Sequence, residues 1–278
     1  MIMNNYQNQD KLEIIILAEN KVYKKGLIAE HGLSFYIKTG DKGYLFDTGQ
    51  GFSIIHNANE IGIDLREIKA VFLSHGHYDH TGGLKKLLEI NKEVTVYAHP
   101  GVFDAKYSGT EYRGGGISRE DIPSFEPVRG VTRTAGNFWL VGDIPGYNNY
   151  EKSSRRYKVK KDNEFTRDNF EDEQVLVIET PQGLIVLSGC AHRGIVNTLE
   201  YVSEKFKGNK IYAILGGMHL INAENSRIKK TVDYLDGIDF KLLVPLHCTG
   251  VEAVNYMVKR FKERVSRGEV GSRFVFPY

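Results

Sequence analysis

Three histidines and one aspartate lie within six consecutive residues: His75, His77, Asp79 and His80. Imidazole and carboxylate groups are seldom packed together unless something satisfies them. Divalent zinc prefers such nitrogen and oxygen ligands, and one compact loop can supply both. Alternation along the chain places the side chains of His75 and His77 on one side of the segment, where they can share one metal ion. Asp79 and His80 then reach a second metal position. We therefore predict two divalent cations, with zinc preferred and iron or manganese as alternatives.

The segment that carries these residues follows a short buried strand predicted at 70–73 and precedes a helix marked by Leu84, Leu87 and Leu88. Upstream, apolar or β-branched runs predict strands, and the apolar spacing over 54–61 predicts a helix. A further strand is expected downstream of the helix. The predicted strands of this half are 14–17, 34–37, 44–46, 70–73 and 94–98.

The second half of the chain repeats this outline. A hairpin is predicted from 175–178 and 184–187, turned at 181–183. Helices and strands then alternate. They are expected at 195–206, 211–215, 228–235, 242–245 and 254–265. Two halves of this kind pack as an α/β sandwich with the layer order helix, sheet, sheet, helix.

Two polar stretches, 101–134 and 147–173, interrupt the alternation on either side of a strand predicted at 138–141. Neither has enough periodic apolar residues for its own core, so we interpret both as insertions covering one face of a single domain spanning 1–278. The second stretch could attract anions, although a run of charges is usually a solvated face. Its basic residues are Lys152, Arg155, Arg156, Lys158, Lys160 and Lys161.

The composition excludes several classes of protein. Hydrophobic residues make up 41% and charged residues 26%, which is sufficient for a core and unlike a disordered chain. A net charge of +2 does not indicate a nucleic-acid binder. Two cysteines are too few for a disulfide scaffold. Residues 1–10 lack the apolar core of a signal peptide, so we expect a cytoplasmic protein without membrane or nucleic-acid partners.

The spacing His75-x-His77-x-Asp79-His80 resembles the signature of the metallo-β-lactamase superfamily. The upstream run Leu45-Phe46-Asp47-Thr48-Gly49 is similar to the strand and turn that precede this signature. The resemblance extends over nearly the whole chain. It implies an αββα sandwich of two mixed β-sheets flanked by helices, with Asp47 supporting the metal site from behind its ligands.

Later landmarks of the superfamily also occur in order. The resemblance places Cys190 where most members have an aspartate that bridges both metals. A thiolate is a good zinc ligand, although a buried structural cysteine is the alternative. The separate family histidine between signature and bridge is missing, because His99 comes too early. His192 lies two residues after Cys190 and is the expected replacement, the alternative being a loop histidine that contacts substrate.

The remaining histidines and Cys248 are assigned by position. The resemblance implies that His247, at the end of a strand, ligates the second metal. Cys248 is expected to pack, pointing away from His247. His99 could either orient substrate or be a satisfied structural residue, whereas His219 is expected to line the pocket rather than bind metal. His31, His56 and the rest carry no signal.

Three segments narrow the resemblance to one branch, which includes the dihydropterin-ribofuranosylaminobenzene phosphate synthase of methanopterin biosynthesis. They are 189–197, 216–220 and 246–250. Residues 142–146 resemble the branch's Gly-Glu-Ile-Pro-Arg, with Gly146 in place of the arginine. If that arginine binds a phosphate in relatives, this chain uses another substrate.

The function predicted first is a metal-dependent hydrolase, in which a metal-activated hydroxide attacks an ester, lactone or phosphoester. Asp79 would orient the nucleophile as well as ligate. The substrate would be a small molecule, and an anionic one is compatible with the basic stretch. The first alternative is a transferase of pterin biosynthesis, forming a C–N bond. The second is a diiron redox protein, although relatives of that kind carry Glu at the position of His77 and a fused flavin domain.

Overall fold

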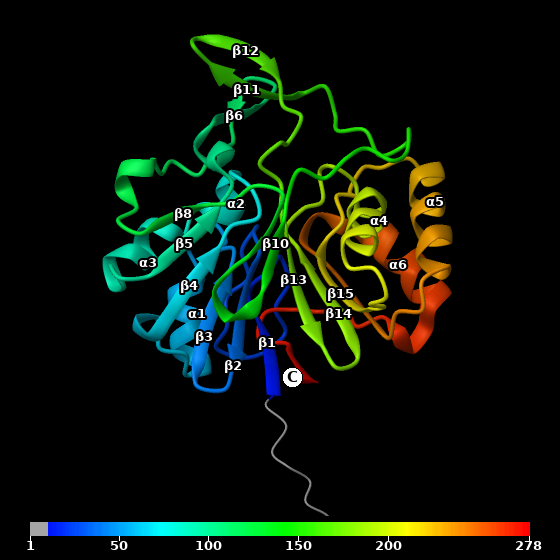
Figure 1. Cartoon of the computed structure of the whole chain (residues 1–278), viewed down its shortest axis with the longest axis horizontal. Helices are drawn as coiled ribbons and strands as arrows, with labels where there is room; N and C mark the ends of the chain where they lie inside the picture. The colour runs from blue at the N-terminus through cyan, green and yellow to red at the C-terminus, as the bar shows by residue number, and fades with distance from the viewer. Residues whose placement is uncertain (1–10) are drawn as a thin grey trace, which may run out of the picture.

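A computed structural model describes residues 11–278, and the expectation about residues 1–10 falls outside this range. Two β-sheets lie face to face, with helices on the outer side of each (Figure 1). This arrangement confirms the predicted αββα sandwich of two mixed sheets. No helix in the described range is long and apolar enough to cross a membrane.

The first sheet has seven strands and combines antiparallel with parallel pairing. Neighbours from β17 to β3 are antiparallel, whereas β3, β4, β5 and β8 run parallel. In spatial order the strands are β17 (Arg273–Pro277), β1 (Lys11–Ala18), β2 (Ser34–Thr39), β3 (Lys42–Phe46), β4 (Ile68–Phe72), β5 (Thr95–Ala98) and β8 (Phe125–Pro127).

Helices α1 (Ile54–Ile61) and α3 (Leu84–Ile90) cover the outer face of this sheet. The predicted helical spacing buries Ile54 and Ala58 in the same cluster as Leu84 and Leu87. Between β4 and α3, the short helix α2 (Tyr78–Thr81) carries Asp79 and His80.

The second sheet has six strands, and its three C-terminal strands run parallel. Its strands in spatial order are β16 (Leu242–Leu246), β15 (Ile211–Gly217), β14 (Gly183–Ser188), β13 (Val175–Thr180), β10 (Trp139–Val141) and β9 (Val131–Arg133). Its outer face packs on α4 (Ile195–Lys205), α5 (Asn225–Asp236) and α6 (Val251–Phe261).

The space between the sheets is filled by apolar side chains from both. Phe35, Phe46 and Phe72 of the first sheet lie in one buried cluster with Leu176 and Leu187 of the second. Alternation along each strand sends every second side chain into this interior. Burial of that surface fixes the two sheets against each other, which brings residues far apart in sequence to a common edge.

A third, four-stranded sheet joins the two polar stretches, for which no strands were predicted. It has the order β12 (Glu164–Arg167), β11 (Tyr157–Lys161), β6 (Ala105–Ser108) and β7 (Glu111–Tyr112). This accessory sheet lies on the same side of the molecule as α2 (Figure 1).

Most other predicted elements appear within a few residues of their expected bounds, but two differences stand out. Strand β17 was not predicted and pairs with β1. Helix α6 ends at Phe261 rather than at 265, because the chain turns there through Lys262 with a φ of 52°. Short 3-10 turns lie at Leu65–Glu67, Pro100–Phe103, Arg119–Asp121, Ala135–Asn137, His247–Thr249 and Lys262–Arg264.

Candidate metal centre

The predicted site residues follow the carboxyl ends of parallel strands in both sheets. Asp47 follows β3, and the segment 75–80 follows β4. Cys190 and His192 follow β14, and His247 follows β16. The ends of parallel strands are where α/β sheets commonly place ligands. Packing of the sheets brings these ends together.

One set of ring nitrogens comes from three histidines. His77 Nδ1 lies 3.1 Å from His75 Nε2 and 3.2 Å from His192 Nε2. Ligands bonded at 2.0–2.1 Å to a tetrahedral zinc ion are separated by about 3.3 Å. All three side chains are buried. The spacing of the three nitrogens therefore fits one divalent cation.

A second set surrounds Asp79. His247 Nε2 lies 3.2 Å from Asp79 Oδ2, and His80 Nε2 lies 4.0 Å from the same oxygen. Like the first set, it joins residues after β4 to a histidine from the second sheet. The structure thus places His75 and His77 in one set and Asp79 and His80 in the other.

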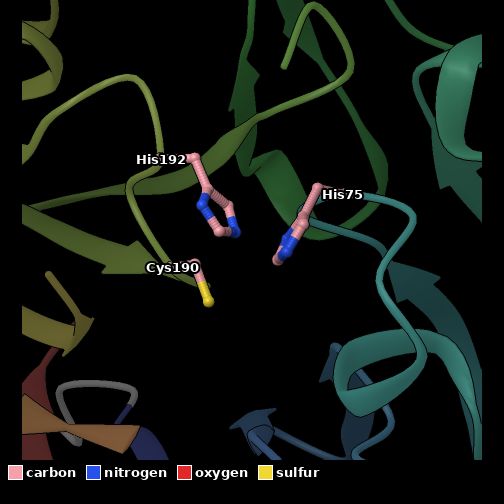
Figure 2. A group of neighbouring side chains, drawn as sticks. All are labelled: His75, Cys190 and His192. Carbon is pink, nitrogen blue, oxygen red and sulfur yellow. The ribbon is translucent and has the colours of Figure 1, made fainter. Parts of the chain in front are cut away.

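Cys190 lies between the two sets. Its sulfur, one nitrogen of His75 and one of His192 all lie within 4.8 Å of one another (Figure 2). The same sulfur groups within 4.8 Å with His80 and His247, and it is 3.2 Å from His80 Nε2. One thiolate could therefore contact cations held by either set.

Burial keeps the imidazoles of the first set in the neutral form that binds metal. Desolvation lowers the pKa of His77 to about 3 and the pKa values of His75 and His192 well below the usual value. These imidazoles are therefore neutral at pH 7, as ligation requires. For Cys190, burial and the neighbouring Cys248 raise the thiol pKa, so thiolate ligation depends on a cation displacing the proton.

The second set carries charge. Burial disfavours the His80 imidazolium, but the carboxylates of Asp47 and Asp79 outweigh that cost and raise the pKa of His80 to about 9. Burial alone would also raise the pKa of Asp79. The facing imidazoles of His80, His247 and His31 instead hold it well below its usual value. Asp79 is therefore ionised at neutral pH.

Hydrogen bonds behind the cluster orient the rings. The Asp47 carboxylate accepts from Ser74 N, Ser74 Oγ and His80 Nδ1, each at 2.7 Å. His247 Nδ1 lies 2.9 Å from Asn20 Oδ1, which can only accept. In both His80 and His247 Nδ1 therefore donates, which makes Nε2 the nitrogen that faces the cluster.

Two glycines allow the close approach of these segments. A Cβ on Gly76 would lie 2.3 Å from the carbonyl oxygen of Val102, and one on Gly189 would lie 2.1 Å from Ser74 Oγ. Several non-glycine residues around the cluster also adopt a positive φ, which is costly and concentrates at functional sites. They are Asp47, Phe170, Ala191, His219, Asn222 and His247.

The accessory sheet and the segment after it form part of the wall. Tyr157 of β11 lies with its ring centroid 5.8 Å from that of His77. Phe170 stacks on His192 with ring centroids 4.0 Å apart and planes 8° apart. Asp172 bonds both to buried Lys106 of β6, at 2.8 Å, and to the backbone N–H of Gly76. The accessory sheet is thereby tied to the histidine segment.

The structure also shows whether four further residues belong to the site. His219 lines the same cavity as the two sets, whereas His99 bonds to Gly101 and Arg129 and lines a different cavity. The structure corrects two expectations. Cys248 faces the site, with its sulfur within 4.8 Å of Cys190 Sγ and a His219 nitrogen. His31, which carried no sequence signal, places Nε2 3.2 Å from Asp79 Oδ2.

Gly146, where the sequence resemblance would place Arg, borders a cavity beside His192. Gly146 lines it together with Lys152 and Arg193, and a Cβ at Gly146 would meet nothing within 4 Å. The space of the missing side chain is therefore open, so relatives with Arg here would differ from this chain in the charge beside the cluster.

A model of the metallo-beta-lactamase superfamily matches residues 27–205, which include the 75–80 segment, Cys190 and His192. The chain belongs to the metallo-β-lactamase superfamily. As expected, it is an enzyme of this fold, and its residues include groups able to hold divalent metal.

Full-length relatives support the resemblance to one branch of the superfamily. The chain is 35% identical over 295 residues to the 7,8-dihydropterin-6-methyl-4-(β-D-ribofuranosyl)-aminobenzene-5'-phosphate synthase of Methanocaldococcus jannaschii, covering 99% of this chain and 100% of the relative. It is 32% identical over 251 residues to the uncharacterized protein MJ0448 of the same organism, covering 87% and 92%. Tm1679, a metal-dependent hydrolase of the β-lactamase superfamily, has a TM-score of 0.83 and 31% identity, covering 95% of this chain and 98% of that structure.

Proposed function

We propose that this protein is a metal-dependent hydrolase with a dinuclear centre. One observation carries the proposal. Cys190 Sγ groups within 4.8 Å with His75 and His192 and, separately, with His80 and His247. A sulfur shared by two ligand sets is suited to two neighbouring cations, for which zinc is the preferred candidate because it accepts nitrogen, oxygen and sulfur ligands.

In this proposal His75, His77 and His192 would hold one cation and Asp79, His80 and His247 the other, with the Cys190 sulfur available to both sets. Cations bound there supply a nucleophile at neutral pH and Lewis acidity for an ester, lactone or phosphoester substrate.

The protein's own residues would then orient the reactants. Ionised Asp79 would orient the nucleophile by accepting a hydrogen bond from it. Tyr157, whose hydroxyl lies 3.4 Å from His219 Nε2, faces the reacting region from the accessory sheet and can hydrogen-bond a substrate oxygen.

Metal analysis tests the assignment. We expect the metal-loaded protein to contain two equivalents and His77→Ala to lose at least one of them. His99→Ala is the matched control, because it removes another buried histidine that lines a different cavity. Unchanged metal content in His77→Ala would overturn the proposed ligand set. Hydrolysis of an ester, lactone or phosphodiester panel should disappear with a chelator and return with zinc.

A second candidate is a synthase reaction like that in the name of the M. jannaschii relative, favoured by 35% identity over essentially the whole chain. Direct assay with the dihydropterin and ribofuranosylaminobenzene phosphate substrates separates the two candidates. Product formation that is lost in His77→Ala would support the synthase. Absence of product together with hydrolysis of the panel would support the hydrolase.

A further inference from the structure

A second cavity adjoins the one that holds the metal-ligand cluster. The two have volumes of about 260 and 250 Å³, and both are lined by Arg156, Tyr157, His192 and His219. The two cavities therefore share a wall. The second, which Asp79 and His247 do not line, is called the outer cavity. The outer cavity is completed by residues of the loop before β11 and by Arg227 of α5.

The wall of this outer cavity is positively charged. Lys152, Arg156 and Arg227 line it, and no acidic side chain of the described range does so. None of the three forms an ion pair with a described residue. The hydroxyl groups of Ser153 and Ser154 line the same wall and add donors between the cations.

Arg227 is the most informative of these cations. Its Nε is buried and has no hydrogen-bond partner, and burial lowers the pKa of its guanidinium. Glu151 is the acidic residue that acts most strongly on it, but its two oxygens accept from the backbone N–H groups of Val196 and Asn197 at the start of α4. A partly buried cation without a partner is costly, and an anionic ligand would remove that cost.

We propose that Lys152, Arg156 and Arg227 bind a phosphate group of the substrate in the outer cavity, beside the cavity that would hold the reacting bond. Three cations match a phosphate monoester, which carries a charge close to −2 at neutral pH, better than a singly charged carboxylate. Guanidinium groups also bind phosphate oxygens in pairs. The location of the reacting bond rests on the proposed function, but the phosphate site itself requires no metal.

The direct test measures binding of inorganic phosphate to metal-free protein by calorimetry at pH 8 and low salt. Metal-free protein is used because cations at the cluster would themselves bind phosphate. We expect Arg227→Gln and Arg156→Gln each to weaken binding about tenfold, as loss of a charge-assisted hydrogen bond does. Sulfate, also a dianion, should compete with phosphate, and acetate should bind at least tenfold more weakly.

Two controls make the result decisive. Arg260→Gln removes the same charge from the exposed side of α6, where the side chain pairs with Asp236, and should leave phosphate binding unchanged. Arg227→Lys keeps the charge and should bind better than Arg227→Gln, which separates recognition from misfolding. Equal binding by wild type and Arg227→Gln, or an equal loss in Arg260→Gln, would overturn the proposal.

Failure of the proposed hydrolase function can be distinguished from failure of the proposed phosphate site. His77→Ala should retain phosphate binding in the metal-free protein whether or not it loses metal. A protein with unchanged metal content in His77→Ala but with phosphate binding that depends on Arg227 would keep the anion site while losing the proposed metal centre.

Discussion

Asp47→Asn tests whether the buried carboxylate behind the cluster controls the second ligand set. The substitution preserves the size of the side chain but removes its charge. Asp47 is fully buried and accepts three hydrogen bonds of 2.7 Å from Ser74 and His80. An asparagine amide can still accept from Ser74 N, but its NH2 group would face donors at Ser74 Oγ or His80 Nδ1.

The magnitude follows from the loss of a partner for His80. Loss of a partner behind a metal-binding histidine typically weakens metal affinity by about 10–100-fold. We therefore expect one of two zinc equivalents to bind that much more weakly in Asp47→Asn. The first set should be less affected, since only His75 is linked to Asp47, through Ser74 Oγ. Competition with a chromophoric chelator resolves the two equivalents.

A pH series on metal-free protein gives a second measurement. The pKa of His80 is raised from 6.5 to about 9, so its charged form contributes stability that is present below pH 6.5 and lost as pH rises through about 9. Wild type should exceed Asp47→Asn in unfolding free energy by about 2 kcal/mol near pH 6, and the difference should shrink toward pH 9. Asp64→Asn, at an exposed aspartate, is the control. Unchanged affinity for both zinc equivalents in Asp47→Asn would refute the reasoning.

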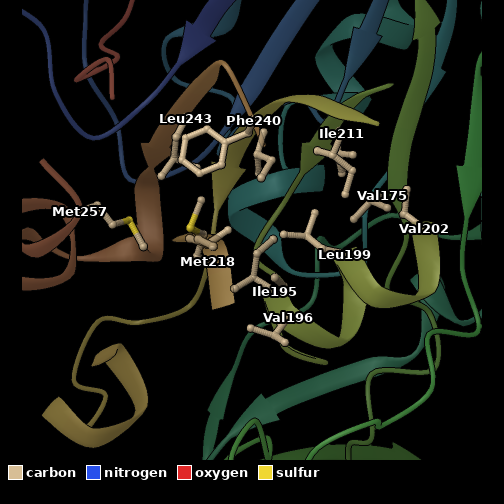
Figure 3. Packing of buried hydrophobic residues seen from close by; sticks show 14 of the residues in the cluster. Val175, Ile195, Val196, Leu199, Val202, Ile211, Met218, Phe240, Leu243 and Met257 are labelled. Atoms are coloured by element: carbon tan, nitrogen blue, oxygen red, sulfur yellow. The ribbon is translucent and has the colours of Figure 1, made fainter. Parts of the chain in front are cut away.

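Three other predictions concern the core, the loop and the acid response. Leu199 lies in the cluster between the second sheet and α4 (Figure 3). Leu199→Ala should lower the unfolding free energy by about 2–5 kcal/mol in urea titrations. A decrease below about 1 kcal/mol would contradict the close packing of this side chain. Gly76→Ala should displace the histidine segment, because its Cβ would meet Val102 O at 2.3 Å. The metal content of the protein should therefore fall. Retention of two metal equivalents would contradict this, because it would show that the segment can accommodate the added methyl group. Metal-free protein should lose stability as pH falls from 7 to 5, because the lowered pKa of His77 means that the unfolded chain binds the proton first. His77→Gln should show a shallower acid dependence, and identical curves would contradict this assignment.

The fold was predictable because its strands and helices alternate with clear apolar periods. The helix predicted at 54–61 coincides with α1, and the hairpin predicted at 175–187 corresponds to β13 and β14. The accessory sheet was missed because its strands are short and polar. All four residues of β12 are exposed, so no apolar alternation marks it. Its pairing of β6 with β11 joins segments about fifty residues apart, which no local pattern shows.

The residues that gather at the candidate site could be predicted where they are clustered in sequence or match a superfamily position. The segment 75–80 satisfies both conditions. His31 satisfies neither, because it lies alone before β2 and reaches Asp79 only after the sheets are packed. Cys248 was misjudged because its direction was inferred from its neighbour His247, without allowance for the 3-10 turn at His247–Thr249 and the positive φ of His247. Phe170 gave no signal, since stacking on an imidazole depends on a tertiary contact.

Each ligand set combines the two halves of the chain. His75 and His77 from the first half require His192 from the second, and Asp79 and His80 require His247. In the proposed centre each cation takes ligands from both halves, so the complete site forms only once the apolar interior between the sheets has packed. Cations bound at the proposed centre should therefore stabilise the packing of the two sheets by mass action, because they would bind the folded chain in preference to the unfolded one. Cys190 groups with residues of both sets, so in the proposed dinuclear centre removal of its sulfur should weaken the binding of both cations, whereas removal of His247 should weaken chiefly one.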